Sequence, residues 1–128
     1  MSHLFNKSNS NLKVAQDLYP NPDLCCASVH CSYYSCFQLI KHLLMFVIMP
    51  YYTLPHKDAH KEAHLRMMNA LGQVDPNSAF KFNNEYKDLQ GFRTESDYEN
   101  VVATPAVAER AYKKAVSIRT TITSIFAP

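Results

Sequence analysis

The fold is decided by residues 21–50, NPDLCCASVHCSYYSCFQLIKHLLMFVIMP. Asn21 is a good helix cap, Pro22 suits the first helical position, and the carboxylate of Asp23 is favoured beside the positive end of the helix dipole. Beyond them, apolar residues recur at alternating steps of three and four, which is the seam of a bundle helix. They are Cys26, Val29, Tyr33, Cys36, Ile40, Leu43 and Val47. A second apolar flank runs beside this seam, so we expect a long central helix that ends before Pro50.

Two further helices are predicted on either side of this segment. Residues 1–9 are expected to be a loose lead-in. The polar residues from Asn6 to Asn11 offer Ser or Asn side chains that can cap a short helix with Leu12, Ala15 and Leu18 at helical spacing. After Pro50 and Pro55, a third helix is expected from about His56 to Leu71, with Gly72 as its C-terminal stop.

The fourth and last helices follow a turn over residues 72–78. The fourth places Phe82, Tyr86 and Leu89 on one face. The last is capped by Thr104, has Pro105 at its first position and repeats small or branched apolar residues in a three-four rhythm. These residues are Ala108, Ala111, Ala115, Ile118, Ile122 and Ile125.

Composition supports an all-α chain. Only two of the 128 residues are glycine, whereas folds of many short strands need frequent glycine-containing turns. The length suits one domain over residues 1–128, and nearly half of the residues are apolar. The sequence therefore predicts a single up-and-down bundle of four to five helices, with the second and last helices at its centre.

Charge and apolar runs narrow the classes of partner. The net charge of +2 gives no domain-wide positive field, so any nucleic-acid contact is local. The N-terminal residues have no apolar signal core, and the most apolar run, residues 43–49, is too short to span a bilayer. All four cysteines lie in the predicted central helix without the spacing of a metal or redox motif. We expect reduced thiols in a cytoplasmic protein that does not contact membranes.

Three histidines recur at every fourth residue: His56, His60 and His64. Neighbouring imidazoles at this spacing share a helix face and can chelate a transition metal. No cysteine or acidic ligand completes a known zinc motif, and the outer face of a bundle helix needs polar residues in any case. We expect no metal in this ladder and, because standard enzyme signatures are absent, no cofactor.

Arg93 is the anomaly of the fourth helix, because it continues the line of Phe82, Tyr86 and Leu89. A guanidinium on a core line must be paired or must face a ligand. Asp97, one turn further on, is the nearest partner. We predict that both side chains point toward the second helix near Tyr34 or His30. If the pair is structural, Arg93→Ala should cost about 3 kcal/mol of stability.

Short motifs along the chain carry a resemblance to a known family. They are residues 27–37 (ASVHCSYYSCF), Ala59-His60, residues 89–98 (LQGFRTESDY) and the helix of residues 111–118. In this order they resemble the HEPN superfamily of prokaryotic helical proteins, in a branch with a Tyr-Tyr-x-x-Phe helix and an Arg-x-x-x-Asp-Tyr step. The match spans about residues 12–122, and each motif is short.

This resemblance implies a bundle of four or five helices, often a two-fold homodimer, with a role in nucleotide or RNA transactions. Many relatives are RNases or partners of small nucleotidyltransferases in toxin-antitoxin pairs. Nuclease members depend on an arginine followed after four to six residues by histidine. Here every histidine precedes the first arginine, Arg66, so that pair is absent.

The leading hypothesis is a HEPN-like protein that binds nucleotide, RNA or a protein partner without the usual nuclease pair. Its expected ligand-binding residues are Arg93, Asp97, Tyr98, Tyr34, His30 and His60. Arg93 would hold phosphate and the tyrosines would frame the pocket. Two alternatives remain open at this point. One is an RNase with a non-standard site built from His30 or His60 with Arg93, and the other is a purely structural interaction domain.

Overall fold

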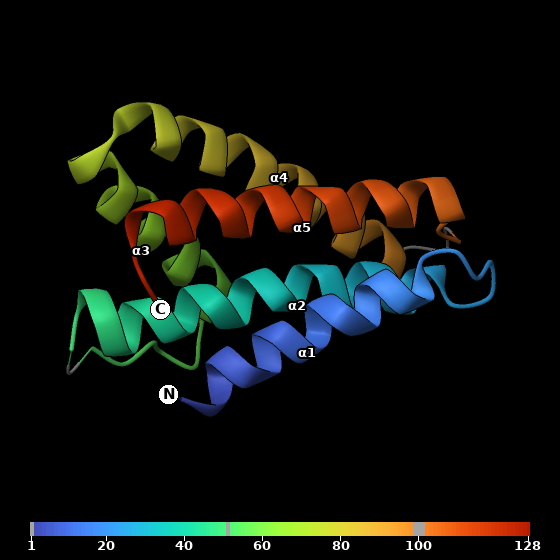
Figure 1. Cartoon of the computed structure of the whole chain (residues 1–128), viewed down its shortest axis with the longest axis horizontal. Coiled ribbons are helices and arrows are strands. Elements are labelled where there is room, and N and C mark those ends of the chain that lie inside the picture. Colours follow the sequence, from blue (N-terminus) through green and yellow to red (C-terminus); the bar gives the residue numbers. More distant parts are fainter. Residues whose placement is uncertain (1, 51, 99–101) are drawn as a thin grey trace.

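The computed structural model describes residues 2–50, 52–98 and 102–128, apart from the side chain of Tyr98. Over these residues the chain is all-helical, with five α-helices and one π-helical turn. They are α1 (His3–Leu18), α2 (Cys25–Leu43), η1 (Leu44–Ile48), α3 (Ala59–Val74), α4 (Pro76–Tyr98) and α5 (Pro105–Ile125). In Figure 1, α1 and α4 run in one direction while α2 and α5 return, with α3 inclined at one end.

Helices α2 and α5 form the centre of the bundle, as predicted. Each of them contacts all four of the other described α-helices, whereas α1 packs only against these two. On α2 the seam from Val29 to Leu43 is fully buried, although its ends differ: Cys26 is only partly buried and Val47 is exposed. The predicted face of α5 is buried from Ala108 to Ile122. Its small first half lets neighbouring helices approach closely.

The first helix begins earlier than expected. It starts at His3, and Ser2 is its cap, because the Ser2 hydroxyl accepts a hydrogen bond from the Phe5 amide. Residues 3–9 are therefore helical and not a loose lead-in. Ser8 is fully buried, with its hydroxyl bonded to the Phe5 carbonyl and to Arg119 of α5. A polar residue that looked like lead-in is thus an inward-facing contact.

The boundaries of α2 and α3 also differ from the expected ones. Helix α2 begins at Cys25, while the Asn21 side chain accepts a hydrogen bond from the Asp23 amide in the turn before it. Helix α3 begins at Ala59 after Asp58, the one described non-glycine residue with positive φ (60°), a conformation that aspartate tolerates better than most residues. His56 therefore precedes the helix.

Gly72 does not stop α3, contrary to expectation. The helix continues to Val74, and the described glycines all have negative φ. A single residue, Asp75, separates α3 from α4. Its carboxylate accepts hydrogen bonds from the Asn77 amide and the Ser78 hydroxyl, so it caps α4 and makes a longer turn unnecessary.

The π-helical turn η1 continues the apolar end of the central helix as far as Ile48, two residues before Pro50. The Met49 amide bonds the Leu44 carbonyl, five residues earlier. Together α2 and η1 form a stretch, Cys25–Ile48, that is long and apolar enough to cross a membrane by length and composition alone. The sequence-based expectation considered only residues 43–49. Since 56% of the most apolar window is buried within the bundle, the stretch also fits the core helix of this fold.

Candidate functional site

The site predicted from the sequence lies where α4 crosses α2. Phe82, Tyr86 and Leu89 of α4 are fully buried. Arg93 continues the same face of the helix and therefore lies beside α2. The Arg93 and Asp97 side chains are only 16% and 19% exposed. The prediction that both point toward α2 near Tyr34 and His30 is confirmed.

Arg93 is held by charge, by a hydroxyl and by two rings. Its Nε donates to Asp97 Oδ2 at 3.1 Å, and its Nη2 donates to the Tyr34 hydroxyl at 3.2 Å. The guanidinium carbon lies 5.0 Å from the centre of the Tyr33 ring and 5.5 Å from that of Tyr34. These distances suit cation–π attraction, which strengthens as the cation loses water.

His30 shares the same carboxylate. Its Nδ1 lies 3.0 Å from Asp97 Oδ2, so the imidazole donates from Nδ1 to a carboxylate that also accepts from Arg93. The ring centre lies 4.5 Å from that of Tyr34, and the His30 side chain is 48% exposed. We call His30, Tyr34, Arg93 and Asp97 the Arg93 cluster.

His60 is joined to the cluster through the tyrosines. The Tyr86 hydroxyl donates to the Tyr33 hydroxyl at 3.2 Å, which leaves the Tyr33 proton for His60 Nδ1 at 2.7 Å. This order puts the proton of neutral His60 on Nε2. Burial, and secondly the charge of Arg93, lower the pKa of His60, while burial raises the pKa of Tyr33 and Tyr86. The relay is therefore uncharged at neutral pH.

The histidine ladder is divided among different partners. His64 bonds the Asn83 side chain at 2.9 Å, His60 bonds Tyr33, and His56 is exposed before α3 begins. Burial lowers the pKa of His64 as well. The described residues contain no group of three or more side chains placed to hold a metal ion.

A groove of about 300 Å³ opens beside His60. Its floor includes Phe37, whose ring stacks on His60 at 4.1 Å. The groove is also lined by the polar residues Lys41, Thr53 and His56, and none of its described lining residues is acidic. The remaining lining residues are Met45, Leu54, Pro55 and Ala59. We call this the His60 groove.

Five of the six predicted site residues are thus brought together: four in the Arg93 cluster and His60 beside it. The sixth, Tyr98, ends α4, and its side chain lies outside the described residues. Sequence reasoning missed Lys41 as a site residue. It lies one helical turn beyond Phe37 on α2, and that spacing was the available signal.

Cys25 and Cys36 are packing residues of the hydrophobic core. All four are free, and Cys25 and Cys36 are buried. Burial raises the pKa of the Cys36 thiol to about 12, although Arg119 nearby opposes the shift. A thiol of that pKa is protonated at neutral pH and unreactive.

Comparison of the chain with protein-family models, curated proteins and solved structures found no match. The resemblance to the HEPN superfamily therefore rests on the sequence motifs. Five helices without a strand in the described residues agree with that resemblance only at the level of fold class.

Proposed function

We propose that this chain is a HEPN-like protein that binds a nucleotide or RNA and lacks the usual nuclease pair. The observation that supports it most directly is the His60 groove, where Lys41, His56 and His60 gather without a described carboxylate. The flexible ammonium group of a lysine and the N–H group of a neutral histidine can both donate hydrogen bonds to phosphate oxygens. The adjoining rings offer apolar surface for a base.

Within this proposal the Arg93 cluster positions His60, and the His60 groove binds the ligand. Arg93 already has partners in Asp97 and Tyr34, so it serves to fix the tyrosines that orient His60. His60 then offers its Nε2 proton as a neutral donor, since Nδ1 is occupied by Tyr33. Lys41 supplies the full positive charge.

Binding can be tested with AMP and with a short single-stranded RNA by calorimetry or NMR titration. Lys41→Ala should weaken binding at least tenfold, because a phosphate contact with a cation is lost. Lys13→Ala is the matched control, since Lys13 is an exposed lysine on α1 that is paired with Asp17. Equal binding by both variants, or no binding by the unaltered chain, would contradict the proposal.

The resemblance also leads us to propose a homodimer in the cytoplasm with a nucleotidyltransferase as partner protein. Light scattering at tens of micromolar tests the first part, because a modest interface is already populated at that concentration. A monomer there would count against the dimer. Co-purification with the product of an adjoining nucleotidyltransferase gene tests the second part.

A second candidate function, RNA cleavage, is favoured by His30. A carboxylate that accepts from Nδ1 orients an imidazole so that Nε2 is free to take or give a proton, the arrangement used in general acid-base catalysis. His30 and Asp97 have this arrangement, with Arg93 on the same carboxylate. In this alternative His30 would accept the proton of a ribose hydroxyl.

Cleavage of a fluorescent RNA by the purified chain separates the two functions. If His30 is the base, His30→Ala should abolish cleavage, while His3→Ala, which alters an exposed histidine at the start of α1, should not. Binding without cleavage would leave the first proposal in place and remove the second.

A further inference from the structure

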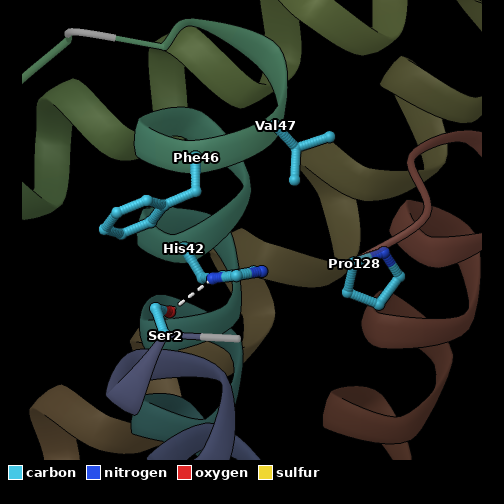
Figure 2. A pocket seen from close by; sticks show the side chains of 5 residues that line it. All are labelled: Ser2, His42, Phe46, Val47 and Pro128. Carbon is cyan, nitrogen blue, oxygen red and sulfur yellow. Dashed lines mark hydrogen bonds between the residues drawn. The ribbon is translucent and has the colours of Figure 1, made fainter.

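A second pocket, of about 400 Å³, lies at the end of the bundle where Ser2 and Pro128 meet the end of α2. It is lined by Ser2, His42, Phe46, Val47 and Pro128 (Figure 2). None of these residues belongs to the Arg93 cluster or to the His60 groove. The pocket is therefore independent of the function proposed above.

His42 is the unusual member of this lining. It is only 3% exposed, and its Nε2 has no hydrogen-bond partner among the described residues. Figure 2 shows this nitrogen directed away from Ser2, toward the space between Val47 and Pro128. A buried polar atom left unpaired costs about 1–3 kcal/mol, so such an atom beside a pocket indicates a missing partner.

The other ring nitrogen identifies what kind of partner Nε2 requires. The Ser2 hydroxyl oxygen lies 2.5 Å from His42 Nδ1 and already accepts from the Phe5 amide as the cap of α1. We assign the hydroxyl proton to this contact, so that the Ser2 oxygen accepts from the Phe5 amide and donates to Nδ1. Neutral His42 then carries its proton on Nε2 and needs a hydrogen-bond acceptor.

The surroundings decide between a charged and an uncharged acceptor. The imidazole lies close to two phenyl rings, with its centroid 5.4 Å from that of Phe5 and 5.7 Å from that of Phe46. Phe46, Val47 and Pro128 are apolar, and the described residues that line the pocket include no lysine or arginine. An anion buried there would lack a compensating cation, whereas an uncharged oxygen would not need one.

We propose that this pocket binds a small uncharged molecule with an apolar body and one carbonyl-type oxygen, which accepts a hydrogen bond from His42 Nε2. The apolar body packs on Phe46 and Val47, which are 56% and 38% exposed. Because Nε2 itself is buried, the oxygen reaches it when the exposed side chain of Phe46 or Val47 shifts. The bond satisfies the buried donor.

Acetophenone is a suitable probe, with benzoate as its charged counterpart. In protein with ¹⁵N-labelled histidine, acetophenone should shift the His42 Nε2 signal saturably at millimolar concentrations, and benzoate should bind at least tenfold more weakly. No saturable shift with acetophenone, equal binding of benzoate, or a signal showing the proton on Nδ1 would each overturn the proposal.

Two variants test the placement of the probe. Val47→Trp fills the mouth of the pocket from an exposed position and should abolish the shift without unfolding the chain. His42→Phe removes the donor and should lose acetophenone binding while keeping the ring packing. His56→Gln, in the other groove, should bind acetophenone as the unaltered chain does. Persistent binding in Val47→Trp would also contradict the assignment.

Discussion

Arg93 and Arg119 are both partly buried, but their guanidinium groups are stabilised by different kinds of partner. Arg93, between α4 and α2, is met by a carboxylate, a phenol and two aromatic faces. Arg119, on α5, is met only by uncharged oxygens: the Ser8 hydroxyl, the Asn9 amide and the Ser35 carbonyl, at 2.6–3.1 Å. No acidic partner of Arg119 occurs among the described residues, and burial lowers its pKa.

The difference shows that the cost of removing a buried cation depends on the groups that it leaves behind. Loss of Arg93 leaves the carboxylate of Asp97, whose side chain is 19% exposed and whose remaining partner among the described residues is His30. Loss of Arg119 leaves neutral groups, of which the Ser8 hydroxyl retains the Phe5 carbonyl. An uncompensated charge is more costly to bury than an unpaired neutral group. The Arg93 region is therefore the more sensitive of the two.

The largest effect is expected for Arg93→Met, which should lower the free energy of unfolding by about 2 kcal/mol. This is less than the roughly 3 kcal/mol expected for a fully buried pair, because His30 still donates to Asp97. Urea unfolding followed by circular dichroism measures it. Arg93→Met combined with Asp97→Asn should recover part of the loss. A single variant as stable as the unaltered chain would mean that the pair contributes no stability.

A smaller effect is expected for Arg119→Met, about 1 kcal/mol, since its hydrogen bonds go to neutral acceptors and its removal relieves a buried charge. The same urea experiment applies. A loss equal to or above that of Arg93→Met would reverse the comparison and show that the linkage between α1, α2 and α5 outweighs charge pairing.

Sequence reasoning found Arg93 and missed Arg119, and the reason is geometric. Arg93 continues a line of three core residues on its own helix, so its burial follows from spacing. Arg119 directly follows the buried Ile118, and the contacts that hold it come from other helices, chiefly from Ser8 and Asn9 of α1. Those contacts join residues more than 100 positions apart and leave no local signal.

Helix boundaries show the same limit. The Thr104 cap and Pro105 of α5 were predicted correctly, because the capping contact to the Val107 amide is local. The end of α3 was not, because Gly72 suits a helix stop as well as a close contact. Its added Cβ would lie 3.8 Å from Ala79, an ordinary distance, so neither choice is forced by space. The Asp75 cap of α4 decided the boundary.

The smallest effect concerns pH, and it distinguishes the two arginines by their influence on the pKa of His60. Burial and then Arg93 lower the folded-state pKa of His60, and burial lowers that of His64. The unfolded chain therefore binds more protons just below pH 6.5, so stability should fall as the pH is lowered from about 6.5 toward 5.5. Each histidine can contribute a slope of at most about 1.4 kcal/mol per pH unit.

Unfolding measured across this range should give a shallower slope for His60→Gln and an unchanged slope for His56→Gln, whose side chain is exposed. Arg93→Met should flatten the slope slightly, because the nearby positive charge that disfavours protonated His60 is removed. Arg119→Met should not, since Arg119 is not among the groups that shift the pKa of His60. Equal slopes for the two arginine variants would show that burial alone, without Arg93, keeps His60 neutral.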